Sequence, residues 1–377
     1  MGEADTEPRT RDIHDEPVTT MGRRRFVDAL LSAGFGATAA TLLSAEDVAA
    51  ADRDQVPIVY GLSRDDDGEF RPKRRTVPAD WYDDFRSAVA VHRNYEFVAR
   101  ESIASSAVVP GEYGGTNASI HVAVTDEAAR GTVPESVEDV PVEVTNVTGG
   151  EPREERDEPT FDSPVTDAGG IPGSVGIASD DLYGTLAPAM RHPEDGSLYF
   201  ATANHVYDGA DNSGKPLYLL DGDRVEIGTI VESYPKSDLA CARPHDDYEP
   251  LHRIRDGSPG RVLGQFTKAG LADLKADGEP LQKIGINTGH TQGKIQAIDG
   301  LTCAYGAICK RGQLKWGSES SFADGDSGSV NYHPDPDDPE AGVLIGGFNN
   351  ARTWWPGENY VWGTAAYHIT EKHGYTF

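Results

Sequence analysis

The stretch FADGDSGSV, residues 322–330, decides how this chain is interpreted. Glycine, aspartate and serine are the ordinary residues of turns, so by itself the stretch predicts no more than a turn between apolar segments. A serine between glycines can also act as a nucleophile in acyl transfer. That chemistry needs a histidine that accepts the serine proton and a carboxylate that orients the histidine. The rest of the chain therefore separates the two interpretations.

Two further stretches supply the groups that a serine nucleophile needs. His205 lies in LYFATANHVYDG (198–209), where an apolar run ends in small residues just before the histidine. Asp238 lies in SYPKSDLACARP (233–244), where a turn leads an acid into the start of an apolar run. With Ser327, the order along the chain is His, Asp, Ser. These three residues form a candidate catalytic triad.

Beyond residue 170, short runs of β-type residues alternate with turn signals. This spacing predicts an all-β barrel or sandwich over residues 171–377. The final segment, GTAAYHITEKHGYTF, predicts a short closing helix. The predicted strands cover residues 197–203, 217–220, 224–231, 238–242, 282–286, 293–298 and 342–348.

The stretches around these residues resemble the motifs of the chymotrypsin-like (trypsin-like) serine proteases, particularly their compact prokaryotic branch. The resemblance rests on Thr-Ala-Asn-His (202–205), Ser-Asp-Leu-Ala (237–240) and Gly-Asp-Ser-Gly-Ser (325–329). A fourth stretch, KIGINTGHTQGKI (283–295), is similar to a glycine-rich hairpin of the family's second barrel. The resemblance covers about residues 170–377. It implies a mainly β, chymotrypsin-like double β-barrel with a short C-terminal helix.

The resemblance also implies a role for each residue of the motifs. Ser327 would attack a carbonyl, His205 would accept and return the proton, and Asp238 would hold the imidazole. The backbone N–H groups of Gly325 and Ser327 would bind the oxyanion. Asp326 would shape the loop by pairing with a buried cation or polar group.

The same resemblance places a substrate pocket near Ser321, six residues before the nucleophile. Gly346 and Gly347 would line its wall, and Phe348 would narrow it. Since Ser321 is not acidic, we expect an apolar or small side chain before the scissile bond. No metal or cofactor is expected, because there is no Cys-x-x-Cys pair and the remaining histidines lack metal-ligand spacing.

The N-terminal segment has the features of an export signal. Arg23 and Arg24 precede a weakly apolar stretch from Ala29 to Ala45, which resembles a twin-arginine signal peptide spanning residues 1–51. Cleavage after Ala51 fits the small-residue rule, and an uncleaved anchor is the competing interpretation. We therefore expect export by the twin-arginine route and an extracellular or cell-surface location.

Residues 52–150 predict a small α+β module without obvious chemistry. A helix opened by Asp80 would place Trp81, Phe85 and Val89 on one face, and strands are expected at 102–109, 118–125 and 140–147. The position of this module suggests a propeptide that makes an inhibitory contact with the protease domain. Residues 151–170 are acidic and rich in glycine and proline, which is typical of a linker.

The charge of the chain narrows its partners. With 34 Lys and Arg against 62 Asp and Glu, the net charge is −28. Such an acidic surface disfavours nucleic acid and anionic membrane, so we expect no nucleic-acid partner and no stable membrane partner after signal removal. The resemblance to serine proteases implies polypeptide substrates. Acidic residues are spread along the chain, which suits a salty medium and resembles the proteins of halophilic archaea.

Of the three cysteines, Cys303 and Cys309 could close a small hairpin, and Cys241 is expected in a buried strand.

Three functions remain open at this point. The first is a secreted serine endopeptidase that works through an acyl-enzyme. The second is a catalytically silent binding or scaffold protein that keeps the protease fold, and the third is an esterase with the same triad. An α/β-hydrolase is disfavoured, because that fold has the order Ser, acid, His and a glycine where Ser329 stands here.

Overall fold

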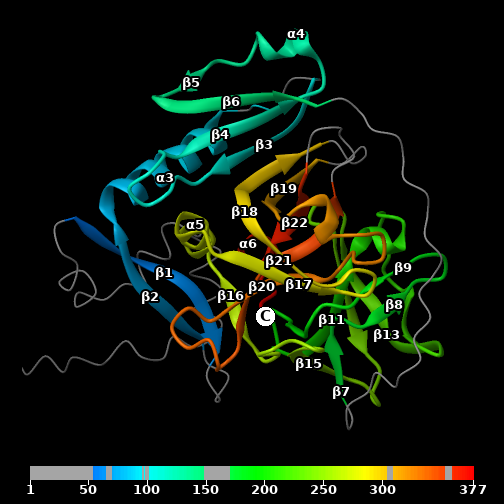
Figure 1. The fold of residues 1–377 in the computed structure, drawn as a ribbon. Helices are drawn as coiled ribbons and strands as arrows, with labels where there is room; N and C mark the ends of the chain where they lie inside the picture. Colours follow the sequence, from blue (N-terminus) through cyan, green and yellow to red (C-terminus); the bar gives the residue numbers. More distant parts are fainter. Residues whose placement is uncertain are drawn as a thin grey trace, which may run out of the picture.

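The computed structural model describes residues 54–64, 70–95, 97, 102–147, 170–303, 309–352 and 359–377. The predicted signal peptide and nearly all of the predicted linker lie outside these residues. Two β units and a preceding α+β module make up the described chain (Figure 1).

The first β unit is a seven-stranded antiparallel sheet in the order β10-β11-β14-β13-β12-β8-β9. A separate parallel pair joins β7 (Gly170–Gly173) to β15 (Glu249–Ile254). Alternate residues of the strands, such as Phe200 and Ile227, are fully buried in one core. The strands are β8 (Gly176–Ala178), β9 (Tyr183–Thr185), β10 (Met190–Arg191), β11 (Leu198–Ala203), β12 (Pro216–Asp221), β13 (Asp223–Tyr234) and β14 (Leu239–Pro244).

The second β unit is a closed barrel. Its ring runs β17-β18-β19-β22-β21-β20 and returns to β17, and every pair in it is antiparallel. Closure leaves no free strand edge within the ring. The strands are β17 (Pro280–Gly285), β18 (Gly289–Thr302), β19 (Lys310–Trp316), β20 (Val330–Pro334), β21 (Val343–Arg352) and β22 (Val361–Ala365). Helix α6 (Ala366–His373) follows the last strand.

The N-terminal module is joined to the second barrel by backbone hydrogen bonds. Strand β1 pairs with β16 (Val262–Phe266), which lies beside β21, and β3 pairs with β18. One thirteen-stranded sheet therefore includes both regions (blue, cyan and yellow in Figure 1). The elements are β1 (Gln55–Arg64), β2 (Phe70–Pro78), α3 (Ala79–Asn94), β3 (Ile103–Val109), β4 (Ser119–Val124), α4 (Glu127–Arg130), β5 (Ser136–Val137) and β6 (Val140–Asn146).

The module and the barrel also share one hydrophobic core. It includes Ile58 and Trp81 from the module, and Phe266 and Trp316 from the barrel side. Helix α5 (Lys268–Asp277) lies in this region, and Arg75 of β2 pairs with its Asp273 at 2.8 Å. Removal of the module would expose this core and the edges of β16 and β18.

Helix α3 begins one residue before the predicted Asp80, and Trp81 and Phe85 are buried as expected. The other buried residues of this helix are Ala88 and Val91, whereas the predicted Val89 is only partly buried. A strict four-residue spacing drifts off the face of a helix with 3.6 residues per turn, which explains this difference.

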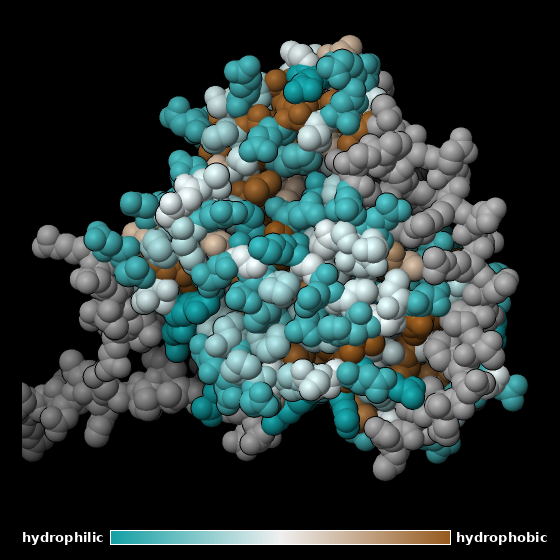
Figure 2. All heavy atoms as spheres, in the orientation of Figure 1, coloured by the Kyte–Doolittle hydropathy of each residue, from teal (hydrophilic) through white to brown (hydrophobic). Residues whose placement is uncertain are grey.

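The structure confirms the predicted fold class, which is mainly β with two β units, a short C-terminal helix and a preceding α+β module. Cys241 is buried in β14, as expected. Hydrophilic residues predominate on the face drawn in Figure 2. Among the described residues, Leu182 is the one large hydrophobic side chain classed as exposed.

Candidate active site

The structure brings His205, Asp238 and Ser327 together where the two β units meet. His205 Nε2 lies 2.8 Å from Ser327 Oγ, and His205 Nδ1 lies 2.8 Å from Asp238 Oδ2. Asp238 and Ser327 are 2% and 7% exposed, whereas the His205 side chain is 37% exposed. A serine hydroxyl, an imidazole and a carboxylate thus form one hydrogen-bonded chain that opens to solvent at the histidine.

His205 is held by a short 3-10 turn, Asn204–Tyr207, that directly follows strand β11. The fully buried Asn204 fixes this turn. Its Nδ2 donates to the Ala210 carbonyl at 3.0 Å, and its Oδ1 accepts from Ser233 Oγ at 2.5 Å. Asn204 therefore ties the histidine turn to strand β13.

Asp238 stands at the start of β14 with a left-handed backbone, φ 50°. This conformation is rare outside glycine and is typical of constrained functional sites. Its Oδ1 accepts from the His205 backbone N–H at 2.9 Å, so both carboxylate oxygens hold the histidine. Burial opposes the charge on Asp238, but His205 and Lys310 outweigh burial and keep the pKa of this carboxyl well below its ordinary value.

A lysine also reaches the triad carboxylate. Lys310 Nζ donates to Asp238 Oδ2 at 2.6 Å, the same oxygen that His205 Nδ1 contacts. The Lys310 side chain is 13% exposed. Asp238 is therefore a buried anion with a directly bonded cation.

The nucleophile loop needs two glycines with left-handed backbones. Gly325 has φ 90° and Gly328 has φ 91°. A Cβ on Gly325 would lie 2.6 Å from Asn287 Nδ2 and closer still to Tyr183. A Cβ on Gly328 would overlap Thr185 and Thr202. Any side chain at these positions would distort the loop on both sides of Ser327.

Thr185, at the end of β9, clamps the loop from the first β unit. Its backbone N–H donates to the Ser327 carbonyl at 2.8 Å, and its Oγ1 donates to the Gly325 carbonyl at 2.8 Å. From the other side, Gly328 N–H donates to the Asn349 carbonyl at 2.9 Å. Among the described residues, nothing accepts a hydrogen bond from the backbone N–H of Gly325 or Ser327. These two donors are free to bind an incoming oxyanion.

Asp326 anchors the loop from inside. It forms an ion pair with Lys283 of β17, Nζ to Oδ2 at 2.7 Å, and both side chains have no exposed surface. The Ala323 and Asn287 backbone N–H groups donate to its carboxylate at 3.0 and 2.9 Å, and Thr288 Oγ1 donates at 2.6 Å. Buried charges are tolerated when they are paired and hydrogen-bonded, which is the case here.

The residues predicted for a substrate pocket are buried or lie within a strand. Ser321 is 3% exposed, and its Oγ accepts from the Ser318 N–H at 3.1 Å. Gly346 and Gly347 lie within β21, where Gly347 is flanked by β20 and β22. Phe348 is 1% exposed and packs against Phe377, with ring centroids 5.5 Å apart, instead of narrowing a pocket. The alternation of side chains along β21 turns Phe348 into the core between the β units.

Sequence reasoning missed four residues that support the site, Thr185, Lys283, Lys310 and Asn349. Lys283 had a usable signal, because it is a lysine in a short β-type run, QKIGI (282–286), within the hairpin that resembles the family motif. The other three carry no local pattern, and only the tertiary structure brings them to the loop.

Comparison with known proteins gives structural neighbours only. No protein-family model matches the sequence, and no curated protein matches it. One similar solved structure is a glutamic acid specific serine protease that uses a histidine triad in substrate binding, with 17% identity and a TM-score of 0.41, covering 55% of this chain and 99% of that one. Another is Thermobifida fusca Protease A, with 18% identity and a TM-score of 0.39, covering 55% and 97%.

Cellulomonas bogoriensis chymotrypsin is similar at 19% identity and a TM-score of 0.40, again covering 55% of this chain and 97% of that chain. Identities and TM-scores this low do not establish the function of this chain. Within the described ranges, no three or more His, Cys, Asp and Glu side chains are grouped to hold a metal ion.

Proposed function

We propose that this chain is a serine endopeptidase that cleaves peptide bonds through an acyl-enzyme formed on Ser327. The observation that carries this proposal is the continuous hydrogen-bonded chain from Ser327 Oγ through His205 to Asp238, beside two free backbone N–H groups. A core or surface role requires none of these polar groups to meet at one place.

The geometry supports a defined sequence of steps. Ser327 Oγ forms a bond to the substrate carbonyl carbon while His205 Nε2 takes its proton. The carbonyl electron pair moves to oxygen, and the Gly325 and Ser327 N–H groups stabilise the oxyanion. Protonated His205, stabilised by Asp238, then gives its proton to the leaving amine as the C–N bond breaks. A water oxygen then bonds to the acyl carbon while His205 Nε2 takes a proton from the water. His205 returns this proton to Ser327 Oγ as the ester bond breaks, which releases the acid and restores the enzyme.

Preorganised donors account for a large part of such catalysis. Loss of one oxyanion donor costs about 3 kcal/mol of transition-state stabilisation. In this chain, Thr185, Asn349 and the Asp326–Lys283 pair fix the loop before substrate arrives, so little reorganisation accompanies the reaction. With Ser321 uncharged, we propose that the preferred residue before the scissile bond is small or apolar.

Casein hydrolysis by the full chain in high-salt buffer tests the proposal, with His205→Ala as the matched inactive variant. We expect the wild type to release peptides and the variant to release none above background. Hydrolysis of nitrophenyl esters without cleavage of casein would instead favour the esterase. A folded wild type that is inactive on both substrates would favour the silent scaffold.

We also propose that the enzyme is exported by the twin-arginine route and works outside the cell or at its surface, on polypeptides and without a metal or cofactor. This rests on Arg23, Arg24 and the small residues before Ala51. In the part of the chain that the structure describes, no helix is long and apolar enough to cross a membrane. Replacing both arginines by lysine should retain the protein in the cytoplasm, and unchanged secretion would contradict this route.

A further inference from the structure

The triad carboxylate has an additional partner, Lys310. Asp238 Oδ2 accepts from both His205 Nδ1 at 2.8 Å and Lys310 Nζ at 2.6 Å, and Oδ1 accepts from the His205 backbone. A carboxylate has about four lone-pair sites, so these three donors fit without competing for one position. The lysine therefore adds to the histidine contacts and does not replace them.

The need for a cation follows from the resting state of the site. A histidine that is ready to accept the Ser327 proton is neutral, so it supplies no counter-charge to Asp238. A carboxylate that is 2% exposed is costly to keep ionised unless it is paired. Within the described residues, Lys310 is the one lysine or arginine in direct contact with it.

We propose that Lys310 is a positioning residue that keeps the Asp238 carboxylate ionised and aimed at His205 Nδ1 in the resting enzyme. It acts through Asp238 and touches no reacting atom. This inference deepens the proposed function and rests on it for its effect on rate.

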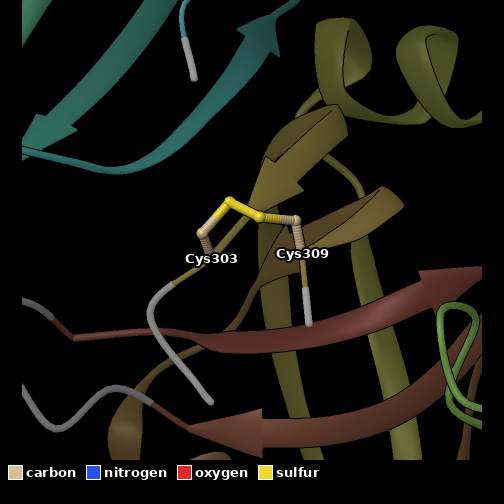
Figure 3. The surroundings of a disulfide bond; sticks show 2 residues. All are labelled: Cys303 and Cys309. Atoms are coloured by element: carbon tan, nitrogen blue, oxygen red, sulfur yellow. A yellow bond between two sulfur atoms is a disulfide. The ribbon is translucent and has the colours of Figure 1, made fainter. Parts of the chain in front are cut away.

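The backbone at Lys310 is held both by strand pairing and by a neighbouring disulfide. It is the first residue of β19 and pairs with Thr302 of β18. The residue before it, Cys309, forms a disulfide with Cys303 at the end of β18 (Figure 3). The start of β19 is thus tied to β18 by the sheet and by a covalent bond, and the lysine extends from a constrained backbone.

The lysine also bridges the two halves of the site. His205 and Asp238 come from the first β unit, whereas Ser327 and Lys310 come from the second. A second contact between the two β units lies next to it, where Thr364 Oγ1 of β22 donates to the Ser237 carbonyl at 2.8 Å. Lys310 therefore helps to hold Asp238 in register with the barrel that carries the nucleophile.

The test compares wild type, Lys310→Met, Lys310→Arg and the control Lys236→Met. Lys236 is exposed in the turn just before Asp238, so its replacement removes the same charge without the contact. Two quantities are measured for each folded protein, the rate of Ser327 labelling by a fluorophosphonate and the downfield NMR resonance of the His205 Nδ1 proton. That resonance is assigned by its loss in His205→Ala.

We expect Lys310→Met to label about ten- to a hundredfold more slowly, the range for loss of one hydrogen bond to a charged group. Its Nδ1 proton resonance should shift or broaden. Lys310→Arg should recover most of both signals, and Lys236→Met should match the wild type. In casein assays, the loss in Lys310→Met should fall on kcat and leave KM unchanged.

Wild-type labelling and an unchanged proton resonance in Lys310→Met would overturn the inference. An equal loss in Lys236→Met would do so as well, since it would assign the effect to charge alone. If wild type itself fails to label, the proposed function fails, and the resonance still decides whether Lys310 positions Asp238. Should Lys310→Met not fold, Lys310→Gln, which is also neutral but keeps a polar end, takes its place in both measurements.

Discussion

The buried pair between Lys283 and Asp326 gives the sharpest prediction about the nucleophile loop. Replacing Lys283 by Met keeps the length and apolar stem of the side chain but removes the cation. Asp326 then becomes an unpaired buried carboxylate, because both side chains have no exposed surface. It keeps other donors, among them the backbone N–H groups of Ala323 and Asn287 and the hydroxyl of Thr288.

The magnitude follows from those contacts. Breaking a buried ion pair by removing one partner costs about 3–5 kcal/mol. Since several donors to Asp326 remain, we expect the lower end, about 3 kcal/mol in the free energy of unfolding. Asp326 lies between Gly325 and Ser327, so a shift of its carboxylate also displaces both oxyanion donors. We expect labelling of Ser327 to slow about a hundredfold, as for loss of one such donor.

Urea unfolding and fluorophosphonate labelling measure the two effects. The matched control is Lys294→Met, an exposed lysine on the adjacent strand β18, which should change neither. The double variant Lys283→Met/Asp326→Asn removes both charges and should cost at least about 1 kcal/mol less than the sum of the single variants. A loss below about 1 kcal/mol in Lys283→Met, or strict additivity in the double variant, would contradict a stabilising role for the buried ion pair.

Three further predictions concern the loop, the N-terminal module and the response to acid. Gly325→Ala places a Cβ against Asn287 and Tyr183 at a residue with φ 90°. The rate of Ser327 labelling should therefore fall at least about a hundredfold, while circular dichroism shows that the protein stays folded. A labelling rate near that of the wild type would contradict this loop geometry. A chain that begins at residue 166 loses β1 to β6 and their shared core, so it should be insoluble or unfolded, and a soluble active fragment would show that the module is dispensable. Burial, with smaller charge effects, lowers the pKa of three histidines to about 4, whereas the pKa of histidine in the unfolded chain is about 6.5. Between these two pH values the unfolded state binds more protons than the folded state, so the free energy of unfolding should fall as the pH drops from 6.5 to 4. A free energy of unfolding that stays constant from pH 7 to 5 would contradict this prediction. These histidines are His252, His368 and His373.

Local patterns were sufficient to predict much of the half of the chain that carries the triad. Short runs of β-type residues between turn signals predicted segments that overlap strands such as β11, β13 and β18. The three triad residues could be selected because each sits at a strand end or turn in a motif of its own.

The joining of the module to the barrel could not be predicted in this way. Strand β2, FRPKRRTVP, is rich in basic residues and prolines, which hides its β character. The pairing of β1 with β16 links residues about 200 positions apart, and no local pattern specifies such a partner. Residues 52–150 were therefore predicted as a separate small module, and the structure joins the described strands of this module to the main sheet.

The supporting residues escaped prediction for the same physical reason. Lys310 follows a cysteine and begins a strand, which is an unremarkable setting for a lysine, and only the meeting of two β units brings it to Asp238. Phe348 shows the opposite case. The family resemblance suggested that Phe348 narrows a pocket, but in the structure its side chain belongs to the core.

The central claim is that Ser327 is a nucleophile activated by His205. The most direct measurement is the intact mass and peptide map of the full chain after reaction with a fluorophosphonate in high-salt buffer, beside Ser327→Ala and His205→Ala. We expect one adduct, on Ser327, that is absent from Ser327→Ala and forms much more slowly in His205→Ala. A folded wild type without an adduct, or an adduct that persists in Ser327→Ala, would contradict it.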